Sequence, residues 1–226
     1  VTSVMAAKKL IKNFKPDIVI GTGGYVSWPV LKAAAQSKIK TCIHEQNAYP
    51  GVTTRLLSKY VDKVMISFEE SVKFFDCDKE KLVFVGNPVA AKMLTYNKAS
   101  ARKELGIEKD ARVILSCGGS LGARSINENV YELIKEYSVK QDVYHFHATG
   151  KSGWETQSKL YKELGFRQID DETLKYKNIT VTKYIYNMHL LLSACDVEIC
   201  RAGAMTLSEL ALLGKAAIVI PSPYVT

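Results

Sequence analysis

The sequence predicts an α/β fold with two domains, each built on a parallel β-sheet that helices cover on both faces. Two observations predict it: short β-branched runs alternate with amphipathic stretches along the whole chain, and a glycine-rich segment follows a strand in each half. Such alternation is typical of parallel sheets, whose strands are joined by crossover helices. A chain of 226 residues can bury two cores. We therefore expect two Rossmann-like domains facing a cleft, residues 1–92 and 93–226, both incomplete in this chain.

The first half supplies the elements of one domain. Its apolar runs predict strands at 17–20, 39–43, 62–67 and 82–85. The stretches between them predict helices at 2–14, 27–36, 51–59 and 69–75. A polar junction, "GNPVAAKMLTYNKASARKELGI", then separates the two halves.

The second half repeats the pattern. Strands are expected at 112–117, 142–147, 179–184, 196–200 and 216–220. Helices are expected at 124–137, 152–164, 187–194 and 205–213.

Composition and charge narrow the class of protein. The hydrophobic share of 47% and the charged share of 24% are those of a globular domain, and no apolar run reaches the ~18 residues of a membrane span. Five cysteines without a CxxC pair suit buried thiols in a reducing compartment. Residues 1–92 hold 14 Lys and Arg against 8 Asp and Glu, whereas residues 93–226 hold 17 against 15. The first half therefore suits an anionic partner.

The first helix is amphipathic, with a basic strip beside an apolar one. At 100° per residue the apolar arc holds Val4, Ala7, Leu10, Ile11 and Phe14. The neighbouring arc holds Lys8, Lys12 and Lys15, with Met5 among them. One interpretation is core packing with a solvated basic face. The other is contact with an anionic membrane surface.

Two glycine loops stand between a strand and a helix, where backbone N–H groups can face an anion. "GTGGYV" (21–26) and "CGGSLG" (117–122) both miss the dinucleotide pattern G-x-G-x-x-G, at Val26 and Cys117 respectively. "HFHATGKS" (145–152) ends like a P-loop but has His145 at the first glycine position. NAD and ATP are therefore poor candidates. A bound phosphate ester and a tight turn without ligand both remain open.

Two further segments allow a structural and a functional interpretation. "CRAGAMTLSELALLG" (200–214) is a third candidate loop, but Thr206 and Glu209 also fit a helix capping box. "IHEQNAYPG" (43–51) places polar side chains after a strand, either for a ligand or for a hydrogen-bonded loop. His145 and His147 share one face of a strand, which predicts either a packed or a solvent-facing pair, and no spacing supports a metal site.

Five motifs in this order carry a specific resemblance: "GTGGYVSWP", "HEQNAYPG", "GNPV", "GGSLGARSIN" and "CRAGAMTLSELALLG". The chain resembles the MurG family, the UDP-N-acetylglucosamine:undecaprenyl-diphospho-muramoylpentapeptide N-acetylglucosaminyltransferases of peptidoglycan synthesis. The resemblance implies a GT-B fold and conversion of lipid I to lipid II. It also implies a peripheral location on the cytoplasmic face of the bacterial cell membrane. UDP-GlcNAc is then a substrate; no cofactor, metal or nucleic acid is expected.

The resemblance also implies roles for particular residues. The donor site would comprise Asn47, Gly118, Gly119, Ser120, Gly122, Ile185, Ala204, Met205, Thr206 and Glu209. In it Ser120 and the glycine loop would meet the UDP diphosphate, the backbone of Ile185 would hold the uracil edge, and Glu209 would accept from the ribose hydroxyls. Asn47 would bind the donor sugar. The acceptor diphosphate site would comprise Gly23, Gly24 and Tyr25, and the membrane contact Val4, Met5, Lys8, Lys12 and Lys15.

The chain departs from the family in two places. Ala90 stands where many relatives have an arginine that reaches the donor diphosphate. The family's glycine loop with its candidate histidine base would precede Val1, and its donor-sugar glutamine would follow Thr226. His44 and Glu45 are fallback candidates for the base, and we expect the chain by itself to transfer no sugar. The alternatives are another UDP-sugar protein of this fold, such as a UDP-GlcNAc epimerase, and a non-catalytic nucleotide-binding module at the membrane surface.

Overall fold

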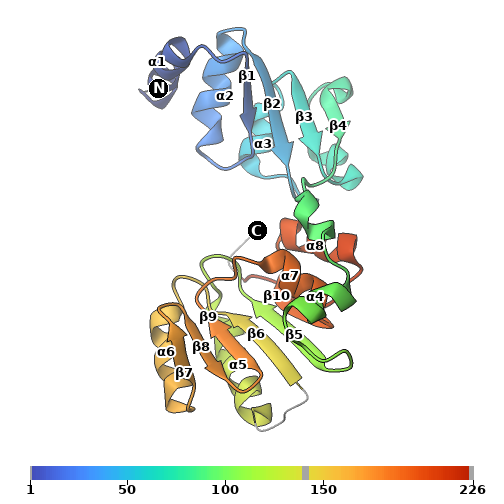
Figure 1. Ribbon diagram of the computed structural model, residues 1–226. Helices are drawn as coiled ribbons and strands as arrows, with labels where there is room; N and C mark the ends of the chain where they lie inside the picture. Colours follow the sequence, from blue (N-terminus) through green and yellow to red (C-terminus); the bar gives the residue numbers. More distant parts are fainter. Residues whose placement is uncertain (1, 139–142, 224–226) are drawn as a thin grey trace. The chain divides into compact units, whose positions relative to one another are not determined.

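The computed structural model describes residues 2–138 and 143–223 and divides into two compact units, Val1–Pro88 and Val89–Thr226 (Figure 1). The sequence placed the boundary after residue 92. Residues 89–92 instead belong to the second unit, because they lead into a short 3₁₀ helix, η3 (Ala91–Leu94), which packs on helices of that unit. Met93 of η3 is buried there.

Unit 1 is a parallel sheet in the order β1-β2-β3-β4. The strands are β1 (Ile18–Gly21), β2 (Lys40–Glu45), β3 (Lys63–Ile66) and β4 (Leu82–Phe84). The helices are α1 (Thr2–Phe14), α2 (Ser27–Gln36), α3 (Val52–Leu57), and the 3₁₀ helices η1 (Glu69–Phe74) and η2 (Lys79–Lys81). The core lies between α2, α3 and the sheet, around Leu31, Ile43 and Leu57. The expected parallel α/β unit is confirmed.

Unit 2 is a larger sheet in the order β11-β10-β5-β6-β9-β8-β7. The strands are β5 (Arg112–Cys117), β6 (Val143–Ala148), β7 (Arg167–Asp170), β8 (Thr173–Tyr176), β9 (Ile179–Thr182), β10 (Val197–Arg201) and β11 (Ala216–Ile220). The helices are α4 (Lys98–Glu104), α5 (Arg124–Tyr137), α6 (Trp154–Glu163), α7 (Met188–Ala194) and α8 (Ala204–Leu213). Strands β11, β10, β5, β6 and β9 run parallel, as expected. The predicted strand 142–147 begins at residue 142, which lies outside the described residues.

The hairpin of β7 and β8 is an addition that the sequence did not predict. These strands pair antiparallel with each other and with β9 at the edge of the sheet. Every side chain of β7 is exposed, and β8 buries Leu174 alone. With so little burial, the segment shows none of the apolar alternation by which a half-buried strand is detected.

The two faces of the second sheet carry separate cores. One packs Leu115, Leu191 and Leu192 under α7 and α8, and the other packs Ile126, Ile134 and Tyr161 under α5 and α6. The second core contains a buried polar chain. Ser116 Oγ lies 2.6 Å from His145 Nε2 and 2.8 Å from His147 Nδ1. Of the two arrangements that the sequence left open for these histidines, the structure shows the packed one, with both side chains fully buried.

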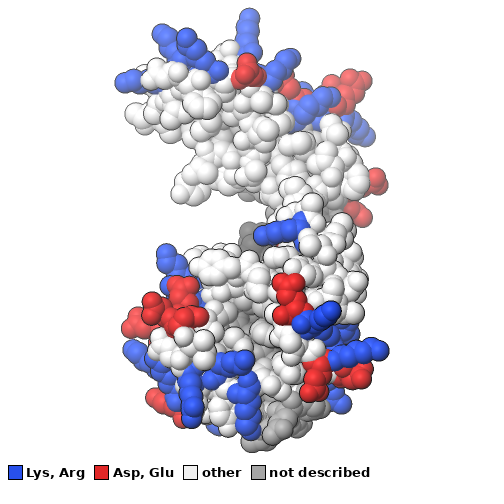
Figure 2. All heavy atoms as spheres, in the orientation of Figure 1, with Lys and Arg blue, Asp and Glu red and all other residues white. Residues whose placement is uncertain are grey.

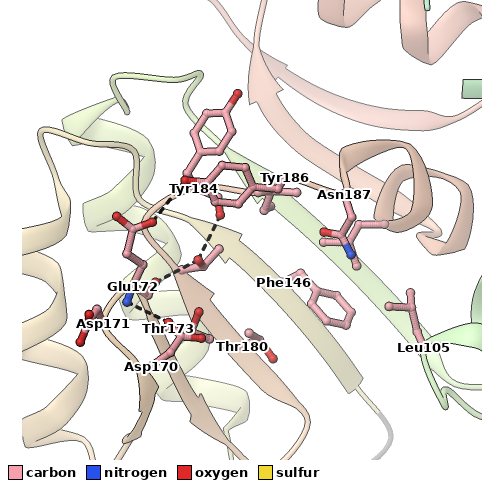
Figure 3. Close-up of a pocket in the computed structure, with 13 residues that line it drawn as sticks. Leu105, Phe146, Asp170, Asp171, Glu172, Thr173, Thr180, Tyr184, Tyr186 and Asn187 are labelled. Atoms are coloured by element: carbon pink, nitrogen blue, oxygen red, sulfur yellow. Dashed lines mark hydrogen bonds between the residues drawn. The ribbon is translucent and has the colours of Figure 1, made fainter. Parts of the chain in front are cut away.

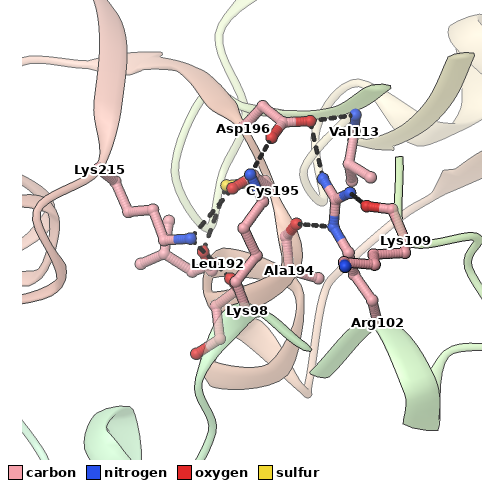
Figure 4. A network of polar contacts seen from close by, with 10 residues as sticks. Lys98, Arg102, Lys109, Val113, Leu192, Ala194, Cys195, Asp196 and Lys215 are labelled. Carbon is pink, nitrogen blue, oxygen red and sulfur yellow. Dashed lines mark hydrogen bonds and ion pairs between the residues drawn. The ribbon is translucent and has the colours of Figure 1, made fainter. Parts of the chain in front are cut away.

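A polar network anchors α4 to the second sheet (Figure 4). Buried Arg102 donates to the carbonyl of Ala194 at 3.1 Å and to Asp196 at 2.8 Å. Asp196 also accepts from the Val113 N–H at 2.7 Å and pairs with Lys98 at 2.5 Å. Burial raises the pKa of Asp196, but these donors and cations outweigh it, so the pKa lies below its ordinary value. The network fixes the segment that connects the two units onto unit 2.

Candidate nucleotide-binding site

The glycine loop 118–122 is shaped by close backbone contacts. A Cβ on Gly118 would lie 2.4 Å from the Ala123 nitrogen, and one on Gly122 would lie 2.1 Å from the Thr149 carbonyl oxygen. Gly122 also has a φ of +89°, which side-chain-bearing residues rarely adopt. The loop turns through a hydrogen bond from Gly122 N–H to Gly119 C=O. Larger residues at positions 118 and 122 are therefore excluded by the loop itself.

The loop opens α5, whose N-terminus is free of capping side chains. Its N-cap is Ala123, which cannot accept a hydrogen bond through its side chain, and the first turn contains no acidic residue. Among the described residues, the hydroxyl of Ser120 has no partner. A helix start with this geometry presents N–H groups and a partial positive charge, which favour an anion such as a diphosphate.

The P-loop-like segment 150–153 has a structural role that the sequence did not predict. The Lys151 N–H donates to the Ser120 carbonyl at 3.1 Å, and the Ser152 N–H donates to the Leu121 carbonyl at 3.0 Å. Gly150 permits this approach, because its Cβ would lie 2.1 Å from the Gly122 nitrogen. The segment therefore holds the glycine loop in place.

Ile185 anchors the loop that follows β9. Its side chain is 6% exposed and packs into the core under α7. In the described part of the chain, neither its N–H nor its C=O has a hydrogen-bonding partner. Beside the loop lies a hollow of about 470 Å³, lined by Phe146, Ile185, Tyr186 and their neighbours (Figure 3). Ile185 thus presents one donor and one acceptor on a firmly packed residue.

The third segment follows β10 and begins α8. The predicted capping box is wrong: the N-cap is Gly203, Thr206 is the third residue of the helix, and no side chain caps it. Glu209 is half-buried and, within the described residues, makes no hydrogen bond or ion pair. Burial raises the pKa of Glu209, and the charge of Lys92 opposes this shift. The carboxylate therefore remains available to a ligand.

These three segments meet along one edge of the sheet. The loop 118–122 follows β5, Ile185 follows β9, and Gly203 to Glu209 follow β10. The strands run parallel, so their carboxyl ends share the edge where open α/β sheets bind ligands. Ala204, Met205 and Thr206 form the first turn of α8 at this edge. The geometry suits a nucleoside diphosphate.

In unit 1, the "HEQN" segment is a hydrogen-bonded loop. His44 Nε2 lies 3.0 Å from the Gly86 carbonyl, which can only accept, so Nε2 carries the hydrogen and Nδ1 accepts from Gln46 at 3.0 Å. Glu45 Oε1 accepts from the backbone and the side chain of Asn47, both at 3.1 Å, and Oε2 accepts from the Gly51 N–H at 3.0 Å. Both fallback bases therefore have structural roles, and neither offers an unoccupied basic atom to a substrate.

The first glycine loop has an open, left-handed backbone. Gly23 and Gly24 have φ angles of +89° and +74°, and the Ser27 hydroxyl donates to the Gly23 carbonyl at 2.5 Å. Tyr25 is 85% exposed. The loop leads into α2, which has no side-chain cap. Its assignment to an acceptor diphosphate stays a prediction.

Helix α1 buries a narrower strip than its amphipathic pattern predicts. Ala7 and Ile11 are buried against Ala33 and Ala34 of α2. Leu10 and Phe14, also expected in the core, are 64% and 78% exposed, and Met5 is 65% exposed. The expectation is wrong for these two residues because α1 makes this contact along one line of the helix, through Val4, Ala7 and Ile11. Val4 is half-buried, and Lys8, Lys12 and Lys15 are exposed.

Among the described residues, no three His, Cys, Asp or Glu side chains come together as a metal would require. No helix among them is both long and apolar enough to cross a bilayer.

Comparisons with known proteins agree with this geometry. A family model described as the glycosyltransferase family 28 C-terminal domain matches residues 113–226, and the N-terminal domain model of that family matches residues 1–66. A relative from Acetivibrio thermocellus is named UDP-N-acetylglucosamine–N-acetylmuramyl-(pentapeptide) pyrophosphoryl-undecaprenol N-acetylglucosamine transferase. It is 48% identical, over 97% of this chain and 57% of the relative. A relative of the same name from Desulforamulus reducens is 45% identical, over 95% of this chain and 56% of the relative. The chain spans less than three fifths of the length of these relatives.

Solved structures show the same architecture. The MurG of Acinetobacter baumannii is 29% identical with a TM-score of 0.66, over 99% of this chain and 57% of that one. A Staphylococcus aureus MnaA structure with UDP has a TM-score of 0.68, over 98% of this chain and 62% of that one. At 16% identity it shows the fold alone. The predicted GT-B architecture and the resemblance to MurG are confirmed. Glu45, the one carboxylate of "HEQN" that the epimerase alternative would use, is hydrogen-bonded within its own loop.

Proposed function

The chain belongs to glycosyltransferase family 28, and on that premise we propose that it binds UDP-GlcNAc for the transfer of GlcNAc to the muramoyl 4-hydroxyl of lipid I, which gives lipid II. The observation that carries the proposal is the edge of the second sheet. There an uncapped helix start follows β5, the backbone groups of Ile185 follow β9 and the carboxylate of Glu209 follows β10, all of them parallel strands. Within the described residues, neither the Ile185 backbone groups nor the Glu209 carboxylate has a hydrogen-bonding partner. The three features match the diphosphate, the uracil edge and the ribose diol of UDP.

The family resemblance implies an inverting displacement. The acceptor hydroxyl attacks C1 of GlcNAc and its proton passes to a base, while the bond from C1 to the UDP oxygen breaks and negative charge grows on the leaving diphosphate. The N–H groups at the start of α5 stabilise that charge. Fixed donors of this kind need no reorganisation during the reaction. We assign the ribose hydroxyls to Glu209, since one carboxylate can accept from two hydroxyls.

Calorimetry with UDP tests the donor assignment. Glu209→Ala should weaken UDP binding by roughly 1.5–3 kcal/mol, the usual loss for a hydrogen bond to a charged group. Because Glu209 caps no helix, stability should change little. The control is Glu163→Ala, at the end of α6. Equal UDP affinities in both variants and the unmodified chain would refute the assignment. Replacing UDP with 2′-deoxy-UDP should weaken binding less in Glu209→Ala than in the unmodified chain.

A second part of the proposal is that unit 1 docks on an anionic membrane surface through α1. Exposed Met5, Leu10 and Phe14 lie on the same helix as the exposed basic residues Lys8 and Lys12. Figure 2 shows basic side chains gathered over the end of unit 1 that α1 occupies. Apolar side chains that enter the headgroup region and lysines that pair with anionic lipids are the usual features of an interfacial helix. A lipid-linked acceptor such as lipid I would be met at that surface.

A further inference from the structure

The hairpin of β7 and β8 reaches the loop that carries Ile185. Its turn places Glu172 beside residues 182–186 (Figure 3). The Glu172 carbonyl accepts from the Lys183 N–H at 2.9 Å, and the Thr182 hydroxyl lies 2.9 Å from the same oxygen. These backbone contacts continue the pairing of β8 with β9 beyond the last paired residues, Thr173 and Thr182.

The Glu172 side chain extends the contact along the loop. Its Oε1 accepts from Lys183 Nζ at 2.6 Å, and its Oε2 accepts from the Tyr186 hydroxyl at 3.5 Å. The Lys183 and Glu172 side chains are 29% and 35% exposed, so water screens the pair only in part. The two oxygens thus hold the residue two places before Ile185 and the residue directly after it.

The loop depends on these contacts because packing supports it on one side only. The Ile185 side chain is packed into the core, but the hollow of about 470 Å³ lies beside residues 184–187. Tyr186 is 76% exposed and contacts Tyr184 edge-to-face at 5.0 Å, so neither ring is buried under the loop. The orientation of the Ile185 peptide groups is therefore set from the hairpin side.

From these contacts we propose that Glu172 is a positioning residue for uracil selectivity. It fixes the loop so that the Ile185 N–H and C=O face the base in one orientation. The inference rests on the proposed function, in which those groups read uracil. Uracil offers an acceptor at O4 and a donor at N3, whereas cytosine offers a donor at N4 and an acceptor at N3. A fixed donor–acceptor pair separates the two bases, and a loosened loop accepts both.

The test compares UDP, CDP and inorganic pyrophosphate by calorimetry. Glu172→Ala should bind UDP about tenfold more weakly, as expected for one or two lost hydrogen bonds, while CDP binding changes little. Pyrophosphate binding should be unchanged, because the glycine loop is untouched. Glu172→Gln, which keeps an acceptor oxygen, should restore most of the UDP preference. Asp171→Ala, an exposed neighbour in the same turn, is the matched control and should behave as the unmodified chain.

Hydrogen exchange of residues 183–187 separates this inference from the proposed function. Faster exchange in Glu172→Ala than in Asp171→Ala supports the positioning role even if UDP fails to bind, an outcome that refutes the nucleotide assignment alone. An unchanged ratio of UDP to CDP affinity with unchanged exchange overturns the inference. So does an equal loss for UDP, CDP and pyrophosphate, which would mean a general structural defect.

Discussion

The stability of unit 2 at low pH depends on a few buried side chains. Hydrogen bonds link the side chains of Tyr137, His145, Ser116 and His147 in a chain. The buried His147 Nε2 has no partner among the residues that the structure describes. Tyr137 can donate to His145, which donates to Ser116, which donates to His147, or the order can reverse. Both imidazoles are neutral in either direction. Burial lowers the pKa of His147 to about 4 and that of His145 well below its ordinary value.

Neutral burial gives a pH dependence with a definite sign. A histidine whose pKa is lower in the folded state binds protons more readily in the unfolded state. Its contribution to the free energy of unfolding is therefore fully present above about pH 6.5 and is lost as pH falls toward 4. For His147 the loss is about 2 kcal/mol between pH 7 and pH 5. Urea unfolding followed through Trp154 measures it. His147→Phe should flatten the dependence, and an unchanged slope of unfolding free energy against pH would contradict the assignment.

At the scale of elements, the pattern of buried side chains determines which helices and strands can be predicted from the sequence. The helices α2 and α5 begin and end at the residues that the periodicity predicts, since their apolar faces are broad. The hairpin of β7 and β8 was missed because it buries one side chain. The capping box at Thr206 fits the sequence pattern, yet the N-cap of α8 lies three residues earlier, at Gly203. The start of α8 follows the end of strand β10 and not the local capping pattern.

Helix α1 carries a prediction of its own. Replacing Lys8, Lys12 and Lys15 with Glu should abolish co-sedimentation with vesicles that contain anionic lipid. Each lysine contributes about 1 kcal/mol at such a surface, so three changes lower the partition coefficient by at least roughly a hundredfold. The matched control replaces three exposed lysines of unit 2, Lys103, Lys162 and Lys175, with Glu and should keep the binding. Binding of the unmodified chain to neutral vesicles at equal strength would rule out the electrostatic account.

At the scale of the whole molecule, the two α/β units and their parallel sheets were predictable, because alternation of strand and helix leaves few topologies. The candidate site was predictable in part. The glycine loop shows itself by composition, whereas the support from residues 150–153 depends on a close approach between segments some 30 residues apart in sequence. Likewise, the roles of His44 and Glu45 depend on which atoms their side chains meet, which spacing alone does not reveal. The Ile185 assignment came from family resemblance, and its unpaired backbone groups required the structure.

The two units should respond differently to UDP. Each has its own core, and each contains one of the two tryptophans, Trp28 in α2 and Trp154 in α6. A ligand stabilises the part that binds it by about 2.7 kcal/mol at a hundred times its Kd. UDP should therefore raise the melting temperature followed by Trp154 fluorescence in Trp28→Phe. The temperature followed by Trp28 in Trp154→Phe should stay where it is without UDP. Pyrophosphate should give a smaller shift in the same unit, since it engages the glycine loop and leaves Ile185 and Glu209 unoccupied.

An equal shift at both tryptophans would mean that the two units unfold as one. A shift at Trp28 alone would place the nucleotide in unit 1 and refute the donor assignment.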